Sequence, residues 1–268
     1  MTVRITLVGA TGWVGKALVA AIAAADDLML AGAVARTAAG RDAGEAAGGG
    51  PAGVRIVATL EEALGAPSDV VIDYSKPDVV RGHVLAALAA GRDVVVGTSG
   101  LGADDYAEID AAAQAASRGV VAAGNFSVTA TLLRRFALEA ARYVADVEVI
   151  DYASAKKPDT PSGTARELGE MLAAVRQAPT SKPVEELSGL PATRGAAVGG
   201  PIPVQVHSVR LPSYVIGCEA VFGAPDERLT IRHDAGSSAS PYVAGTLLAA
   251  RKVGGRVGLT RGLDALLD

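Results

Sequence analysis

The chain has 268 residues, a formal net charge of −4, 32 glycines and few aromatic residues. The length allows two medium-sized domains with ample buried cores, and a glycine-rich, aromatic-poor composition suits packed βαβ layers. The mild acidity and the lack of a basic run with interleaved aromatics argue against a nucleic-acid partner. A single cysteine, Cys218, excludes an internal disulfide and a cysteine-based metal cluster. We expect no metal site.

The amino terminus carries only a short apolar run, Ile5 to Val8, before the first glycine. Such a run is too short for a signal peptide or a membrane span. Together with the single cysteine, this predicts a cytoplasmic protein with no membrane partner.

The first motif is a β-branched strand at residues 3–8, followed by Gly9-Ala-Thr-Gly-Trp-Val-Gly15 and an alanine-rich helix from Lys16. In the spacing Gly-x-x-Gly-x-x-Gly, the glycines permit a sharp turn and let the backbone approach a pyrophosphate at the helix start. The alternative is an ordinary strand-to-helix turn. The predicted cofactor contacts in this motif are Gly9, Thr11, Gly12, Trp13, Val14 and Gly15.

A second strand, residues 29–34, ends at Ala35-Arg36, where dinucleotide sites usually carry an acidic residue for the ribose 2′-hydroxyl. Without a carboxylate to repel a 2′-phosphate, and with a guanidinium to bind it, NADPH is predicted over NADH. Lys76 is a second candidate for the 2′-phosphate. Either cation is alternatively a solvated surface residue. We expect residues 37–53, rich in glycine and alanine, to form a mobile loop over the cofactor edge.

Further βα units follow, with strands at 54–57, 69–72, 93–96 and 120–121 and helices at 60–64, 78–90 and 103–117. Strands alternating with helices predict an α/β fold, a Rossmann-type parallel doubly wound sheet. Small or polar residues after three of these strands are expected at the carboxyl edge of the sheet, beside the dinucleotide. These predicted contacts are Tyr74, Lys76, Gly97, Thr98, Ser99, Gly124, Asn125 and Phe126.

The pattern changes after Ser127 to a helix at 128–144, a strand at 147–150, a helix from 165 and a Pro/Gly-rich connection from 178 to 203. Three β-type runs, 204–211, 214–222 and 228–233, come next at short spacing, which predicts antiparallel pairing. We therefore expect a second α+β domain, residues 128–235, with a mostly antiparallel sheet. The cofactor domain would comprise 1–127 completed by 236–268, including a helix at 240–253.

A polar turn lies between the strand at 147–150 and the helix from 165. Ser162 or Thr164 can cap that helix, and the amides of Ser162, Gly163 and Thr164 would face outward at the positive end of its dipole. Lys156 and Lys157 add two ammonium groups. This combination predicts a site for a small, carboxylated substrate, held without a metal. The alternative is a capped helix beside solvated lysines.

Together these motifs resemble 4-hydroxy-tetrahydrodipicolinate reductase, the dihydrodipicolinate reductase of bacterial lysine biosynthesis, over nearly the full length. The resemblance rests on the glycine turn and on Gly97-Thr-Ser-Gly100, Asn125-Phe-Ser127, Lys157-Pro-Asp-Thr-Pro-Ser-Gly-Thr-Ala165, His207-Ser-Val-Arg210 and Glu227-Arg-Leu-Thr-Ile-Arg-His233. It implies an NAD(P)H domain, a second domain that binds a cyclic dicarboxylate through Lys157 and Ser162 to Thr164, and association of the second-domain sheets into a homotetramer.

This chain departs from the family pattern at the paired histidines that precede the substrate lysine, because Ala153 and Ser154 stand there. One of those histidines is taken as the proton donor, a role that suits imidazole and that neither alanine nor an ordinary serine fills. The pattern Gly-Glu-His is likewise replaced by Gly217-Cys-Glu219. The three remaining histidines, His83, His207 and His233, are interpreted as structural.

Three functional hypotheses remain open. The first is an NADPH-dependent reductase of small, cyclic, carboxylated imines, since hydride transfer to a protonated iminium needs no proton on carbon. The second is the lysine-pathway reaction with Lys156, Tyr152 or a water as proton donor, Lys156 being attractive if burial beside Lys157 lowers its pKa. The third is a non-catalytic NADPH sensor. In the first two, Lys156 and Lys157 are the predicted catalytic residues, and Ser154 is counted with the substrate contacts.

Overall fold

The computed structural model describes residues 2–267, which form two compact units. The first unit contains the described residues up to Val128 together with those from Ala239, and the second contains Thr129–Ser238. Each unit is built on its own sheet. No helix of the described residues is long and apolar enough to span a membrane.

The first unit is a seven-stranded, fully parallel sheet in the order β12-β6-β5-β4-β1-β2-β3. Its β-branched strands are buried on both faces, as a parallel sheet covered by helices requires. The strands are β1 (Val3–Val8), β2 (Leu28–Val34), β3 (Ile56–Val57), β4 (Val70–Asp73), β5 (Asp93–Val96), β6 (Gly119–Ala122) and β12 (Gly258–Arg261).

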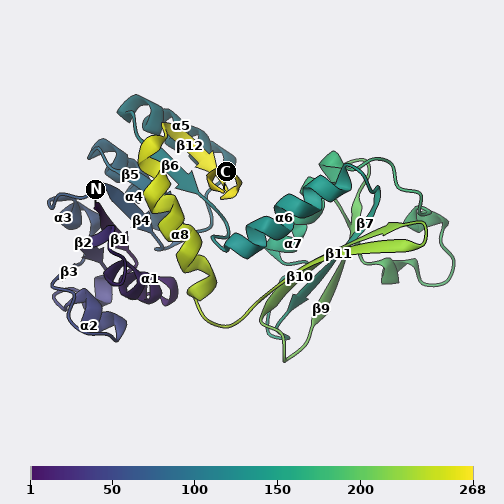
Figure 1. Cartoon of the computed structure of the whole chain (residues 1–268), viewed down its shortest axis with the longest axis horizontal. Coiled ribbons are helices and arrows are strands. Elements are labelled where there is room, and N and C mark those ends of the chain that lie inside the picture. Colours follow the sequence, from purple (N-terminus) through teal and green to yellow (C-terminus); the bar gives the residue numbers. More distant parts are fainter. Residues whose placement is uncertain (1, 268) are drawn as a thin grey trace. The chain divides into compact units, whose positions relative to one another are not determined.

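Helices cover both faces of this sheet (Figure 1). One core contains side chains of α1 (Trp13–Ala23) and α8 (Ser240–Lys252), and the other contains those of α3 (Leu60–Leu64), α4 (Pro77–Ala89) and α5 (Ala103–Ala116). The doubly wound prediction is therefore confirmed. Because all strands run the same way, their carboxyl ends meet at one edge, where ligands of such sheets bind.

Two segments of the first unit differ from their predicted conformations. Residues 37–53 are not a structureless loop, because Arg36–Ala38 form a 3₁₀ turn and Ala43–Ala47 form α2. Asp42 caps α2 by accepting the amides of Gly44 and Glu45, a local signal that the glycine-rich composition obscured. The carboxyl-terminal tail also contributes β12, which pairs with β6.

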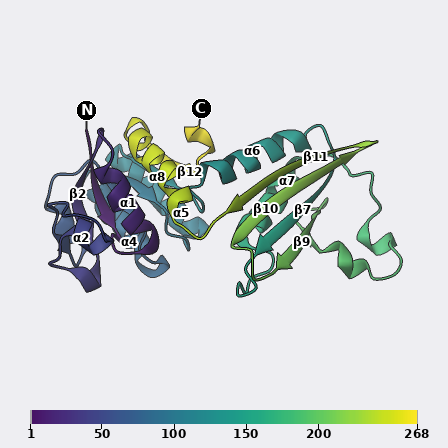
Figure 2. The same cartoon turned by 60° about the horizontal axis from the view of Figure 1, so that its bottom comes forward.

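The second unit is a five-stranded sheet in the order β11-β10-β7-β9-β8, with α6 (Val128–Ala141) and α7 (Gly163–Val175) on one face (Figure 2). Its strands are β7 (Asp146–Ala153), β8 (Ala196–Val198), β9 (Val204–Arg210), β10 (Ile216–Ala224) and β11 (Glu227–Ala235). β7 alternates half-exposed and buried residues, the period-two signature of a sheet covered on one side.

The predicted antiparallel pairing of three consecutive strands is correct for β10 with β11 and wrong for β9 with β10. β7 lies between them, parallel to β9 and antiparallel to β10. The connection after β9 spans the end of β7, where Leu211 donates its amide to Ala153 and Val215 accepts the amide of Ser154. Short spacing therefore indicated the direction of these strands but not their adjacency.

Candidate functional site

The carboxyl edge of the first sheet gathers five of the predicted cofactor segments. In strand order, these follow β6 (Gly124 to Phe126), β5 (Gly97 to Ser99), β4 (Tyr74 to Lys76), β1 (Gly9 to Gly15) and β2 (Arg36). The strand order reverses between β1 and β4, and dinucleotides bind across such a reversal.

The turn after β1 is closed by its own backbone, because the amide of Gly12 donates to the carbonyl of Gly9 at 2.9 Å. Gly9 has a φ of +84°, and a Cβ there would overlap the carbonyl of Tyr74. A Cβ on Gly15 would overlap the carbonyl of Gly9. Gly9 therefore requires glycine for its conformation and for close approach, and Gly15 for close approach alone.

The helix α1 begins at Trp13 with Gly12 as a cap that offers no side-chain acceptor. Within residues 2–267, the amides of Trp13, Val14 and Gly15 have no hydrogen-bond acceptor in the chain. Three free donors at the positive end of a helix dipole suit a pyrophosphate. The Trp13 ring, 58% exposed, packs edge-on against Tyr242 with centroids 5.6 Å apart.

The two cations predicted for a 2′-phosphate are both exposed. Arg36 begins the 3₁₀ turn directly after β2, and Lys76 is the amino-terminal cap residue of α4. Neither side chain makes a hydrogen bond or ion pair with another residue of the described chain. Each can therefore bind a phosphate without first breaking an internal contact.

Among the predicted residues after β4, β5 and β6, some side chains are accessible to a ligand and others are packed in the core. Thr98 is half-buried and Ser99 is exposed. The Tyr74 ring occupies the space above Gly97, and its hydroxyl pairs with Thr246 at 2.7 Å. Phe126 is 1% exposed, so its side chain belongs to the core and only its backbone borders the edge.

Near this edge, sequence reasoning missed Asp73, Ser75 and a role for His83. Asp73 ends β4, is fully buried, and accepts hydrogen bonds from Ser75, Thr98 and His83. The hydrogen bond to Asp73 raises the pKa of His83 above its ordinary value, against the effect of burial. The signal in the sequence was a carboxylate at the end of an otherwise apolar strand.

In the second unit, the turn before α7 is organised by Asp151 of β7. Ser162 caps α7 by accepting the amide of Ala165, and its hydroxyl donates to Asp151 Oδ1 at 2.6 Å. The Ser162 amide also donates to Asp151, at 2.8 Å, so the prediction that it faces outward unpaired is wrong. The amides of Gly163 and Thr164 have no acceptor among the described residues, as an anion site requires.

Arg210 of β9 completes this arrangement, a role that no sequence pattern predicted. Its guanidinium donates to Asp151 Oδ2 and to the carbonyl of Asp159, both at 2.7 Å. Burial would raise the pKa of Asp151, but hydrogen bonds from Ser162 and Arg210 outweigh it and hold that pKa below its usual range. The cap is therefore fixed by a buried ion pair that joins β7, β9 and the turn.

The two lysines before this turn are in different surroundings. Lys157 is partly buried, and its ammonium group lies 2.9 Å from Asp159, so it is paired within the turn itself. Lys156 is exposed, and its side chain makes no hydrogen bond or ion pair in the described chain, so the expected burial beside Lys157 is wrong. The Ser154 carbonyl accepts the amide of Lys157, and its hydroxyl accepts that of Lys156.

Ala153 and Ser154, which stand where the resemblance implies histidines, have side chains that do not act as general acids. Ala153 is fully buried at the end of β7, and Ser154 is half-buried. Tyr152 lies on the other face of β7 from Ala153, and its hydroxyl donates to Glu219 at 3.0 Å. Burial and then Glu219 raise the pKa of Tyr152, so both its orientation and its acidity argue against the predicted role as proton donor.

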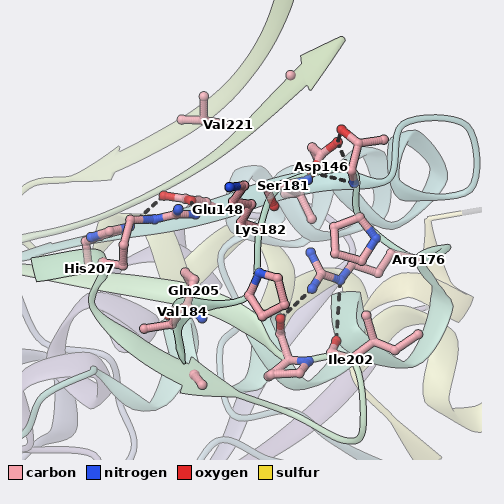
Figure 3. A pocket seen from close by; sticks show the side chains of 18 of the residues that line it. Asp146, Glu148, Arg176, Ser181, Lys182, Val184, Ile202, Gln205, His207 and Val221 are labelled. Atoms are coloured by element: carbon pink, nitrogen blue, oxygen red, sulfur yellow. Dashed lines mark hydrogen bonds and ion pairs between the residues drawn. The ribbon is translucent and has the colours of Figure 1, made fainter. Parts of the chain in front are cut away.

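A cavity of about 920 Å³ in the second unit is not at the predicted substrate site (Figure 3). It lies against the sheet face opposite α6 and α7, beneath the segment from Arg176 to Pro203. Glu148 there bonds His207 at 2.7 Å and also pairs with Arg194. Because Glu148 is paired with Arg194, and neither Lys157 nor the start of α7 lines the cavity, we assign it no catalytic role.

A parallel sheet with a glycine turn at its strand reversal, followed by a second unit on its own sheet, is the architecture expected of a dinucleotide-dependent oxidoreductase. Residues 3–126 match the model of the family described as dihydrodipicolinate reductase, N-terminus, and residues 129–267 match dihydrodipicolinate reductase, C-terminus. The chain therefore belongs to the dihydrodipicolinate reductase family and is an NAD(P)H-dependent oxidoreductase.

Individual relatives agree over their whole lengths. The 4-hydroxy-tetrahydrodipicolinate reductase of Synechococcus elongatus is 41% identical over 266 residues, 97% of this chain and 96% of that enzyme. That of Nocardia farcinica is 39% identical over 100% of both chains. The structure of a dipicolinate-bound dihydrodipicolinate reductase from a Paenisporosarcina species superposes with a TM-score of 0.86, at 27% identity and 99% coverage of both chains.

Proposed function

We propose that this chain reduces 4-hydroxy-tetrahydrodipicolinate with NADPH, the reaction of lysine biosynthesis. The observation that supports this most strongly is the full-length similarity to reductases of that name, at about 40% identity. The turn at residues 156–164, which we call the anion turn, adds a physical argument. Its free amides, those of Gly163 and Thr164, and the ammonium group of Lys157 suit a ring carboxylate. Dipicolinate, bound by the Paenisporosarcina enzyme, is a ligand of that chemistry.

The cofactor edge fits a dinucleotide on the evidence of its glycines, since a Cβ at Gly9 or Gly15 would fill the turn. NADPH would supply the hydride when bound. The amides of Trp13 to Gly15 would hold its pyrophosphate, and Arg36 with Lys76 would bind the 2′-phosphate. The preference for NADPH over NADH follows from those two unpaired cations.

The proton required by the reduction must come from a group other than residues 153 and 154. Of the three proposed proton donors, Lys156, Tyr152 and water, Lys156 is the one side chain that remains. Tyr152 lies on the face of β7 opposite Ala153, and its hydroxyl is bound to Glu219. A water molecule at the turn is the other source. In either case Lys157 keeps its role in binding the substrate carboxylate.

A second candidate is the reduction of cyclic imines, favoured by one observation, the buried Ala153 where the family pattern has histidine. A protonated iminium accepts hydride at carbon without a further proton, so the missing acid would be tolerated. The similarity to named dihydrodipicolinate reductases nevertheless favours the lysine-pathway substrate. A sensor without catalysis would not need both an open cofactor turn and an anion turn.

The deciding experiment measures NADPH oxidation with 4-hydroxy-tetrahydrodipicolinate generated in situ, alongside pyrroline and dihydroisoquinoline imines. We expect the highest kcat/KM with the dicarboxylate. Turnover confined to the imines would replace the proposal with the second candidate. If the chain binds NADPH tightly but oxidises it with none of these substrates, the sensor hypothesis would be favoured.

Lys157→Ala tests the anion turn. We expect KM for the dicarboxylate to rise about 10- to 100-fold, corresponding to loss of a charge-assisted hydrogen bond of roughly 1.5–3 kcal/mol, with KM for NADPH unchanged. Lys182→Ala is the matched control, because Lys182 is exposed and lies outside the turn. A similar rise in KM for an uncharged imine would remove the assigned role of Lys157.

We also propose a homotetramer, associated through the sheet of the second unit. The face of this sheet opposite α6 and α7 carries no α-helix of the described residues. The segment from Arg176 to Pro203 lies over part of it, whereas every second residue of β11 points to that face and is exposed. Light scattering after size-exclusion chromatography checks the assembly. A monomer at micromolar concentration would contradict it.

A further inference from the structure

The carboxylate of Asp73 bonds four donors at the cofactor edge. Its Oδ1 atom accepts the amide of Ser75 at 2.8 Å, the hydroxyl of Ser75 at 2.6 Å and the hydroxyl of Thr98 at 2.7 Å. Its Oδ2 atom pairs with Nδ1 of His83 at 2.8 Å. Asp73 is fully buried, so these contacts satisfy it in place of water.

This arrangement fixes where the hydroxyl protons point. A carboxylate only accepts hydrogen bonds, and a hydroxyl has one proton and two lone pairs. The protons of Ser75 and Thr98 are therefore both directed at Asp73. Toward a ligand, the two hydroxyls can only accept.

The two hydroxyls are also fixed in position relative to the glycine turn. The Tyr74 ring fills the space above Gly97, and its carbonyl lies where a Cβ of Gly9 would be. The Tyr74 hydroxyl is further bound to Thr246 of α8. The segment that carries Ser75 is therefore packed between the turns that follow β1 and β5.

The strand order assigns these hydroxyls to one half of the dinucleotide. Arg36 after β2 marks the side of the adenosine ribose, and the turn after β1 marks the pyrophosphate. β4 and β5 lie on the opposite side of β1 from β2. The nicotinamide riboside half consequently lies over Ser75 and Thr98.

We propose that Asp73 and His83 are positioning residues that fix the hydroxyls of Ser75 and Thr98 as acceptors for a hydrogen-bond donor of the nicotinamide half, its carboxamide NH₂ or a ribose hydroxyl. The inference rests on the cofactor site of the proposed function. Phosphate oxygens, which only accept, are excluded from this part of the edge. Neither Asp73 nor His83 needs to touch the cofactor.

Asp73→Asn gives this proposal a distinctive pH signature. When His83 is charged, its Nδ1–H must donate to the oxygen of the introduced amide, so the amide NH₂ faces the hydroxyls. The hydroxyls then accept from the NH₂ and direct their own protons toward the ligand. When His83 is neutral, Nδ1 can accept from the NH₂. The amide oxygen then faces the hydroxyls, which donate to it as they do to the carboxylate of Asp73. The charged groups that face His83 are Asp73 itself, from β4, and Glu61 of α3.

The measurement is the Kd of NADPH by fluorescence titration of the full chain, which needs no substrate turnover. We expect Asp73→Asn to weaken binding about tenfold relative to wild type at pH 5.5 and less than threefold at pH 8.0. Asp73→Asn combined with His83→Leu should weaken binding equally at both pH values. Melting temperatures at each pH verify that the variants are folded.

His83 variants provide a rescue test. The Asn side-chain nitrogen can occupy the place of Nδ1 and donate to Asp73, whereas Leu cannot. We therefore expect His83→Asn to bind NADPH like wild type and His83→Leu to bind it several-fold more weakly. If His83→Leu fails to fold, the pH ratio of Asp73→Asn alone decides the question.

An analogue with an acetyl group in place of the carboxamide distinguishes the two possible donors. If the effect of Asp73→Asn at pH 5.5 disappears with this analogue, the carboxamide is the donor, and if it persists, a ribose hydroxyl is. If Asp73→Asn loses the same NADPH affinity at both pH values, or loses none, the inference is overturned while the proposed function stands. A wild-type chain that binds no dinucleotide would overturn both.

Discussion

The chain contains two helix amino termini that are suited to anions, and they are built in opposite ways. The start of α1 is shaped by backbone alone, with glycines at the close contacts and no side-chain cap. The start of α7 is shaped by side chains, with Ser162 bound to the buried Asp151 and Asp151 bound to Arg210. The hydrogen bond that closes the first turn is local in sequence, and the second turn depends on a residue of a distant strand.

The difference matches the ligands that we assign to the two turns. A pyrophosphate is large and needs close approach to several amides, which only glycine permits. A small carboxylate needs few donors but a fixed orientation, which a rigid cap and a nearby ammonium group supply. Substitutions should therefore act sterically at the first turn and electrostatically at the second.

The largest effect is expected from Arg210→Met. It leaves the fully buried Asp151 without its cation, and breaking a buried pair in this way costs about 3–5 kcal/mol of unfolding free energy. Chemical denaturation of the full chain measures the loss. Binding of the carboxylated substrate should weaken as well, because Asp151, the partner of the cap residue Ser162, is no longer held in place by Arg210.

The control for this prediction is Arg251→Met. Arg251 pairs with Asp27 in the first unit, but its side chain is 39% exposed. An exposed pair contributes roughly 1 kcal/mol or less. Equal losses for Arg210→Met and Arg251→Met would show that burial does not distinguish the two pairs.

A pair of glycine substitutions contrasts the two turns directly. Gly15→Ala places a Cβ against the backbone of Gly9, and we expect a loss of about 2–4 kcal/mol together with weaker NADPH binding. Gly163→Ala meets nothing within 4 Å and has no positive φ, so stability should change by less than about 1 kcal/mol. Thermal unfolding and NADPH titration check both. A destabilised Gly163→Ala would mean that the second turn also depends on its backbone.

The same contrast explains which features the sequence predicted. The glycine spacing, the parallel sheet and the strand ends at its carboxyl edge depend on short-range patterns, and these predictions of fold were confirmed. The partner of Asp151 could not be predicted in this way. Arg210 is 59 residues away and meets Asp151 only because β9 pairs with β7.

Errors in the predicted elements have the same origin. β9 and β10 were placed side by side because only a short connection separates them, whereas β7, formed much earlier in the chain, lies between them. Pairing depends on contacts between strands, and the spacing of the strands along the sequence carries no information about these contacts. α2, in contrast, does have a local signal, because Asp42 caps it. The glycine- and alanine-rich composition of residues 37–53 nevertheless indicated a loop.

Arg36→Ala should have a smaller effect, confined to one cofactor. We expect KM for NADPH to rise about tenfold, the loss of one charge-assisted contact of roughly 1.5 kcal/mol, with KM for NADH unchanged. Steady-state kinetics with both cofactors provide the test. Arg41→Ala is the control, since Arg41 is an exposed arginine of the same segment. A rise with both cofactors would assign Arg36 to a group other than the 2′-phosphate.

The smallest effect concerns the pH dependence of stability. Because Asp73 raises the pKa of His83 in the folded chain, the stabilisation is fully present below the unfolded value near 6.5 and is lost as pH rises through the folded value. His83→Asn keeps a donor to Asp73 but does not titrate. Its melting temperature should therefore lie below that of wild type at pH 5.5 and approach it at pH 9, a difference worth on the order of 1 kcal/mol or less. A constant difference across this range would mean that the imidazole contributes through packing and not through its charge.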